Sequence, residues 1–196
     1  MLMTEQNQLD EARIAHIAKQ VIALQKEKFG IILVISGAVA YGSNFIDLSK
    51  KQNQLRQAAA GIGQIYLTCT FNRIFSENNL QLAQILLTKD SLRKENQKTK
   101  IKNLIKFYTH SGFIPFINEN DTLDLNSFGG NDLLATEITS LIQAKKLLIL
   151  STMKGGTYGV GGGETKIEAI NILTQKHIQT DILNGKTNNI LLQTLL

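Results

Sequence analysis

A glycine-rich run beside a lysine is the first feature of this sequence that could do chemistry. Six of the 15 glycines fall within 155–163, and Thr165 and Lys166 follow in the segment after it. Glycines let a backbone approach phosphate groups, a helix start supplies a positive end, and Lys166 adds a full charge. A flexible loop with a solvated lysine is the alternative. Because the run follows a predicted buried strand, the pattern favours a site for nucleotide phosphates.

A second polar string follows another predicted strand. Residues 118–122 read Asn-Glu-Asn-Asp-Thr and come directly after the apolar run 113–117. Asn and Asp side chains together offer donors and acceptors for the ammonium and carboxylate groups of a small zwitterion, and loops of this kind often carry function. An ordinary turn is the alternative, because Asn and Asp favour turns. The density of side-chain amides favours a ligand site.

Two further turns contain glycine and are candidates for binding. Ser36 and Gly37 follow the first apolar run, where a small residue beside glycine exposes backbone N–H groups to an anion or a carboxylate. A tight turn that requires small residues is the alternative. Residues 129–132 read Gly-Gly-Asn-Asp and open a predicted helix. Asn131 or Asp132 could be the N-cap of that helix, and Asp132 could also orient a lysine near a transferring phosphoryl group.

Composition and the remaining motifs exclude several classes of function. A net charge of +5 is too small to indicate nucleic-acid binding, and no apolar run approaches the ~20 residues of a membrane span. Dinucleotide and P-loop fingerprints are incomplete, and the three histidines have no partners at metal-ligand spacing. The single cysteine, Cys69, is predicted to be a small core residue. We expect a cytoplasmic enzyme or binding domain without metal-binding side chains, nucleic-acid partner or membrane segment.

The elements that would position these residues alternate between helices and strands. Apolar residues at helical spacing predict helices over 9–29, 54–75, 91–109, 131–144 and 164–176. Short apolar runs predict buried strands over 31–35, 80–87, 113–117, 146–150 and 178–183. The alternation predicts one α/β domain over 1–196, with helices on both faces of a mostly parallel sheet. Such sheets usually begin with a strand, whereas this chain begins with a helix, so we expect a leading strand to be missing.

Several strings of this sequence occur together in one known family. They are ISGAVAYG at 35–42, QAAAGIGQ at 57–64, LLTKD at 86–90, IPFINENDT at 114–122 and GGND at 129–132. In order and spacing they resemble the glutamate 5-kinases, a branch of the amino acid kinase family. The segment GGGETK at 161–166 resembles a further motif of that family, Gly-Gly-Met-x-Thr-Lys. The Asn-Glu-Asn-Asp string is specific to the glutamate kinases within it.

The resemblance implies a three-layer αβα sandwich that forms a cytoplasmic homo-oligomer. Its reaction would transfer the γ-phosphoryl group of Mg-ATP to the side-chain carboxylate of L-glutamate, the first step of proline biosynthesis. The residues that would contact glutamate are Ser36, Gly37, Asp121 and Asn131. Lys166 would stabilise charge on the phosphoryl group and Asp132 would organise the catalytic lysines. The residues that would meet ATP are Ser151, Thr152, Gly161, Gly162, Gly163, Thr165 and Lys166.

The sequence also departs from the family pattern. The family's first strand and its lysine-containing loop have no counterpart, and a Thr-Asp pair that meets the nucleotide reads Ser151-Thr152. A few dozen residues around the adenosine are absent between 155 and 160, and Gly130 replaces an Asp. We expect no C-terminal domain of the RNA-modification type. Since each electrostatic clamp on a phosphoryl group contributes several kcal/mol, loss of the first-strand lysine should slow the transfer by orders of magnitude.

Two other functions stay open at the level of the sequence. One is a catalytically dead paralogue that binds glutamate or a partner subunit, because the glutamate-site residues are kept while the nucleotide-site residues are damaged. The other is a related kinase for a different acidic acceptor, such as a uridylate or acetylglutamate kinase. The string at 118–122 disfavours this second alternative.

Overall fold

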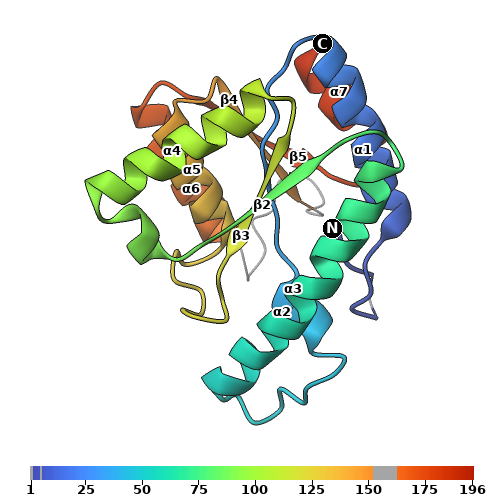
Figure 1. The fold of residues 1–196 in the computed structure, drawn as a ribbon, viewed down its shortest axis with the longest axis vertical. Helices are drawn as coiled ribbons and strands as arrows, with labels where there is room; N and C mark the ends of the chain where they lie inside the picture. The colour runs from blue at the N-terminus through green and yellow to red at the C-terminus, as the bar shows by residue number, and fades with distance from the viewer. Residues whose placement is uncertain (1, 5, 152–162) are drawn as a thin grey trace.

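The computed structural model describes residues 2–4, 6–151 and 163–196, in which helices and parallel strands alternate (Figure 1). The strands are β1 (Leu33–Val34), β2 (Leu82–Leu87), β3 (Ile114–Glu119), β4 (Lys146–Ser151) and β5 (Gln179–Asn184). The helices are α1 (Glu11–Lys26), α2 (Ala38–Gly42), α3 (Asn53–Ser76), α4 (Glu95–His110), α5 (Asn131–Ile142), α6 (Gly163–Gln175) and α7 (Ile190–Leu195), and a 3-10 turn spans Lys89–Leu92. The sequence pattern predicts all five strands and misses the short helices α2 and α7.

The strands pair in parallel, as predicted, but they form two ladders. β3 lies between β1 and β2 in the first ladder, and β4 pairs with β5 in the second. The predicted first strand, 31–35, is shorter than expected, because only Leu33 and Val34 pair as a strand. Helix α5 contacts β1 and β3 of the first ladder and β4 of the second. This helix therefore packs across both ladders.

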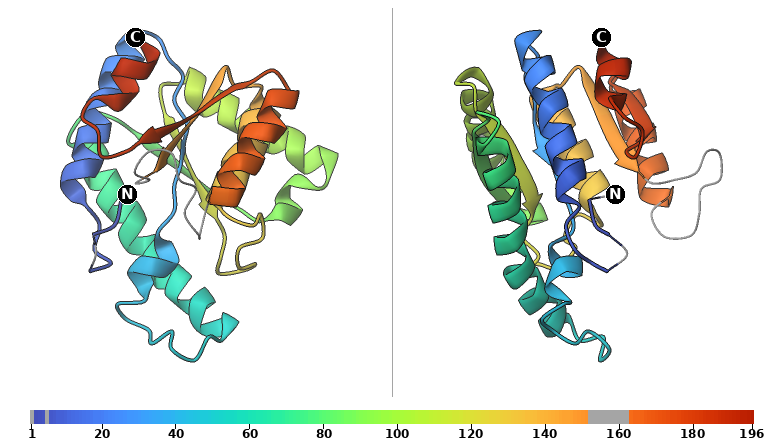
Figure 2. Two further views of the ribbon diagram at one scale, coloured as in Figure 1. Left: turned by 180° about the vertical axis from the view of Figure 1, so that it is seen from behind. Right: turned by 90° about the vertical axis from the view of Figure 1, so that its right-hand side faces the viewer.

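Neighbouring residues of a strand face two separate hydrophobic cores. On one face, Leu33 and Phe116 pack with apolar residues of α1, α3 and α7. On the other face, Val34 and Ile117 pack with apolar residues of α4 and α5, as the alternation of side chains along a strand requires. Helix α6 packs against α5 and β5. The α/β architecture with helices on both sides of parallel strands is confirmed, and its layers are visible in Figure 2.

Glycines allow α2 and α3 to lie in close contact. A Cβ atom at Gly42 would overlap the backbone carbonyl of Ala59, and one at Gly63 would overlap the backbone carbonyl of Ala38. The string QAAAGIGQ at 57–64 therefore has a packing role in α3. Close packing fixes α2, which begins just after the turn at Ser36 and Gly37.

The expectation for the single cysteine is wrong. Cys69 is exposed, because the buried face of the C-terminal half of α3 is formed by Leu67, Phe71, Ile74 and Phe75. At 100° per residue, position 69 points away from that face. Within the described part of the chain, no helix combines the length and the apolar character needed to span a membrane.

Candidate active site

The ends of β1 and β3 bring two of the predicted loops to one edge of the sheet. Val34 pairs with Ile117, and the backbone N–H of Ile35 donates to the carbonyl oxygen of Ile117 at 2.9 Å. Ser36 therefore follows β1 at the same edge at which the loop after Glu119 leaves β3. Ligands of parallel α/β sheets bind at the carboxyl ends of strands. Three of the four residues predicted to contact glutamate, Ser36, Gly37 and Asp121, follow these strand ends.

The turn after β1 has the tight geometry expected of a small-residue pair. Gly37 has a φ of 118°, in the left-handed region that favours glycine, and Ser36 is exposed. The side chain of Met3 lies beside Gly37, with its sulfur 3.3 Å from the place that a Cβ would occupy. Asn44 Nδ2 also donates to the carbonyl oxygen of Asn7 at 2.9 Å. The N-terminal segment therefore packs along this turn.

The polar string 118–122 divides into a buried part and a loop. Strand β3 continues to Glu119, two residues beyond the predicted end, so Asn118 and Glu119 are buried rather than part of the loop. Asn118 Nδ2 donates to Gln64 Oε1 on α3 at 2.8 Å. Asp121 Oδ1 accepts the backbone N–H of Asn126 at 2.7 Å. One oxygen of Asp121 thus shapes its own loop, as the turn alternative predicts.

The carboxylate of Glu119 lies inside the protein at the end of β3. The residue is 3% exposed, and its Oε2 accepts the backbone N–H of Phe128 at 3.2 Å. Burial raises the pKa of Glu119, and the nearby charge of Asp121 raises it further. The backbone N–H groups of Phe128, Gly130 and Ser127 oppose this change by stabilising the ionised form.

Helix α5 presents two predicted site residues in its first turn. Its N-cap is Gly130, and no side chain caps it, so the expectation that Asn131 or Asp132 is the N-cap is wrong. These two residues are instead the first and second residues of the helix. The Oδ1 atom of Asn131 is buried and has no hydrogen-bond partner within the described structure. A buried acceptor without a donor is unusual, and a ligand could supply the missing donor.

Asp132 joins the start of α5 to the start of α6. Its Oδ2 accepts a charged hydrogen bond from Lys166 Nζ at 2.8 Å and a hydrogen bond from Thr165 Oγ1 at 3.2 Å. The side chains of Lys166 and Asp132 are 14% and 25% exposed. Lys166 lies in the first turn of α6, where the positive helix end adds to its charge. In this part-buried ion pair, the Lys166 ammonium and the helix start supply the positive charge that suits an anion such as a phosphoryl group.

The remaining predicted nucleotide residues are only partly described. Ser151 is the last residue of β4 and pairs with Asn184 of β5, and Gly163 is the buried first residue of α6. Thr152, Gly161 and Gly162 lie outside the described residues. In the portions of the chain that the structure describes, no three acidic, histidine or cysteine side chains gather as a metal site.

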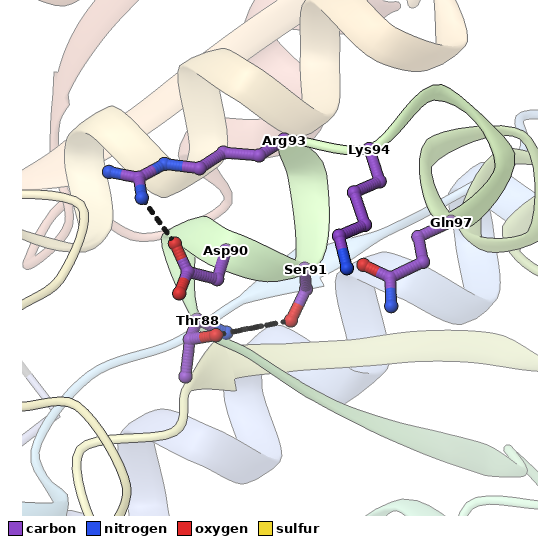
Figure 3. Close-up of a pocket in the computed structure, with 6 residues that line it drawn as sticks. All are labelled: Thr88, Asp90, Ser91, Arg93, Lys94 and Gln97. Carbon is purple, nitrogen blue, oxygen red and sulfur yellow. Dashed lines mark hydrogen bonds and ion pairs between the residues drawn. The ribbon is translucent and has the colours of Figure 1, made fainter.

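A polar hollow that sequence reasoning misses lies just beyond the end of β2 (Figure 3). Its volume is about 430 Å³, and it is lined by Thr88, Asp90, Ser91, Arg93, Lys94 and Gln97. Arg93 is paired with Asp90 at 2.7 Å, and this pair is well exposed. None of the predicted site residues lines this hollow. Next to two of its lining residues, the backbone N–H of Lys89 donates to Ser127 Oγ at 3.0 Å, in the loop that leads to α5.

Comparison with known proteins assigns the family. Residues 2–184 match the amino acid kinase family. The chain belongs to this family. It is 31% identical to the glutamate 5-kinase of Clostridium tetani over 227 aligned positions, which cover 97% of this chain and 85% of that protein. It is 37% identical to the glutamate 5-kinase of Nitrosospira multiformis over 159 positions, which cover 79% of this chain and 43% of that protein.

A solved structure of the same architecture supports the fold. The UMP kinase of Bacillus anthracis superposes with a TM-score of 0.67 at 10% sequence identity, over 98% of this chain and 86% of that protein.

The 227 positions aligned with the Clostridium tetani protein exceed the 196 residues of this chain. That protein therefore carries residues that have no counterpart here.

Proposed function

We propose that this member of the amino acid kinase family is a glutamate 5-kinase, which uses ATP to phosphorylate the side-chain carboxylate of L-glutamate. The proposal is supported by relatives of that name and by the arrangement of Asn131, Asp132 and Lys166. The product would be glutamyl 5-phosphate, which enters proline biosynthesis. Association into a homo-oligomer in the cytoplasm is part of the same proposal.

The observation that carries the proposal is the buried Oδ1 atom of Asn131. It has no donor among the described residues, and it lies one residue from the Asp132–Lys166 pair. An amino-acid ammonium group is a donor that would satisfy this oxygen. The same turn would then hold the ammonium of glutamate, and the side-chain carboxylate of glutamate would extend toward the phosphoryl group that Lys166 meets. Ser36, Gly37 and Asp121 would complete the contacts with glutamate from the edge of the sheet.

In the proposed reaction, an oxygen of the glutamate side-chain carboxylate attacks the γ-phosphorus of ATP. A new bond forms between this oxygen and phosphorus, while the bond from phosphorus to the bridging oxygen of ADP breaks, and ADP leaves with that electron pair. Such transfers depend on positioning and charge stabilisation more than on covalent chemistry of the protein. Lys166 would stabilise negative charge on the phosphoryl oxygens, and Asp132 would hold Lys166 in place.

The nucleotide would be held at the start of α6 and the end of β4. The cation of Lys166, the Thr165 hydroxyl and the helix start at Gly163 have the chemistry of a phosphate site. Ser151, Thr152, Gly161 and Gly162 are proposed to complete it. Mg²⁺ would arrive with ATP and neutralise phosphate charge, because this ion usually binds through substrate phosphates and retained waters.

The experiment is to trap glutamyl phosphate with hydroxylamine in the presence of Mg-ATP. Glutamate, N-acetylglutamate, aspartate and UMP are offered as acceptors in parallel, and ADP formation is measured for each, because hydroxylamine does not trap the phosphate anhydride that UMP would give. We expect product with glutamate only, and Lys166→Met should lower kcat by about 10²–10³-fold, the usual effect of losing one electrostatic stabiliser. Lys146→Met is the control, since Lys146 pairs with Asp181 across β4 and β5. Glutamate binding by calorimetry without any product would favour the catalytically dead paralogue instead.

A further inference from the structure

Glu119 is a buried charge that the proposed reaction does not use directly. It ends β3, pairs in register with Leu87 of β2, and is 3% exposed. Its backbone N–H donates to the side-chain oxygen of Asn118 at 2.9 Å, and that residue is in turn held by Gln64. The carboxylate therefore projects from a rigid central strand whose neighbouring side chains are fixed.

The carboxylate holds the turn that leads into α5. Its Oε2 accepts the N–H of Phe128 at 3.2 Å, and the N–H groups of Ser127 and Gly130 also stabilise its charge. The turn needs this support, because Gly129 and Gly130 have φ values of 85° and 125° and the helix has no side-chain N-cap. The carboxylate at the end of β3 thus binds the backbone just before the N-cap Gly130, in the turn that leads into the helix.

A carboxylate suits this position better than a side-chain amide. The groups that hydrogen-bond to it are backbone N–H donors, although the nearby charge of Asp121 opposes its ionisation, and a carboxylate can accept through both oxygens. The amide of a glutamine keeps one acceptor oxygen but replaces the other with an NH2 donor, which cannot accept a backbone N–H. Burial of a charge is costly and is sustained only where hydrogen bonds compensate it. The geometry therefore depends on the charge of Glu119 as well as on its length.

We propose that Glu119 is a positioning residue that sets the first turn of α5 and so places the Asn131 amide and the Asp132 carboxylate. The inference rests on the proposed function, because it assigns these two groups to the site of phosphoryl transfer. Glu119 itself is in contact with the turn and not with the reacting atoms. Its effect passes along the backbone from Phe128 to Asp132, which holds Lys166.

The test compares Glu119→Gln, Glu119→Asp and the control Gln20→Ala in the full chain. Gln20 is also buried, at 2% exposure, and accepts the N–H of Leu191 in a different part of the fold. Amide hydrogen exchange is followed by NMR, and kcat and KM for glutamate are measured by hydroxylamine trapping. In Glu119→Gln we expect exchange at Phe128 and Gly130 to accelerate about tenfold, the effect of weakening one hydrogen bond. We expect kcat to fall about a hundredfold, the effect of displacing groups of the active site by about 1 Å.

Glu119→Asp keeps the charge but places it on a shorter side chain. The kcat of this variant should therefore lie between those of wild type and Glu119→Gln. Gln20→Ala should lower the melting temperature and leave kcat of the folded protein unchanged. Unchanged exchange at Phe128 and Gly130 in Glu119→Gln, or an unchanged kcat, would overturn the inference. If wild type yields no glutamyl phosphate, the proposed function fails, and the exchange rates alone then decide whether Glu119 sets the turn.

Discussion

Replacing Asp132 by asparagine removes a charge from the centre of the candidate site with almost no change in shape. In the wild type, Asp132 Oδ2 lies 2.8 Å from Lys166 Nζ, and the two side chains are 25% and 14% exposed. Exposed ion pairs contribute about 0–1 kcal/mol, whereas removing one partner of a fully buried pair costs about 3–5 kcal/mol. The Asp132–Lys166 pair lies between these limits. We therefore expect Asp132→Asn to lower the free energy of unfolding by about 1–3 kcal/mol.

The effect on catalysis should be much larger than the effect on stability. The asparagine oxygen can still accept a hydrogen bond from Lys166, but it no longer holds the ammonium group by charge. We expect kcat to fall about 10²–10³-fold, as when one preorganised electrostatic group is lost. Hydroxylamine trapping at saturating glutamate and Mg-ATP measures kcat, and urea unfolding measures stability on the same preparation.

The chain offers a matched control for this variant. Lys146 Nζ and Asp181 Oδ2 are 2.7 Å apart, with side chains 18% and 32% exposed, in the β4–β5 ladder. Asp181→Asn should cost a similar free energy of unfolding while kcat stays within about twofold of wild type. If Asp132→Asn keeps the wild-type kcat, or if both variants lose activity equally, Asp132 has no specific role in the reaction.

Three further predictions concern other parts of the site and its support. Asn131→Leu should raise KM for glutamate at least about tenfold without loss of stability, because it removes an unpaired buried oxygen. Thr180→Val, which also removes such an oxygen, should leave KM unchanged. Gly63→Ala should lower the free energy of unfolding in urea by about 1–3 kcal/mol through overlap with α2, whereas Gly30→Ala has space around its Cβ and should not destabilise the chain. Burial raises the pKa of Glu119 above its usual 4.5, so its contribution to stability is present below that pH and is lost as the pH rises through the raised pKa. Urea unfolding at a series of pH values should show that wild type loses stability relative to Glu119→Gln as the pH rises. Free energies of unfolding that change with pH in the same way for both proteins would contradict this.

The strands and long helices could be predicted because their hydrophobic patterns are strong. Continuous apolar runs indicate buried parallel strands, and a 16-residue or 24-residue helix shows several turns of its periodicity. Helix α2 has only five residues, too few for a pattern, and its place is fixed by contact with α3 through Gly42 and Gly63. Likewise, the short first strand pairs only at the two residues that face β3.

The site was predictable as a set of loops but not as a set of contacts. Asp132 and Lys166 are separated by 34 positions in the sequence. Only the packing of α5 on α6 brings them to hydrogen-bond distance. The pattern also gives no sign that β3 continues through Asn118 and Glu119, because polar residues after an apolar run normally indicate a loop. The ladder with β2 overrides that preference by pairing Leu87 with Glu119.

Helix α5 is the element through which the two halves of the candidate site affect each other. It packs on β1 and β3, which lead to the proposed glutamate contacts, and on β4 and α6, which lead to the proposed phosphate contacts. Within the described residues, no strand of one ladder pairs with a strand of the other. A shift of α5 therefore moves the Asn131 oxygen and the Asp132–Lys166 pair together. Glutamate bound to Asn131 should, for this reason, restrict the same helix turn that positions Lys166, so the two substrates should bind with positive coupling.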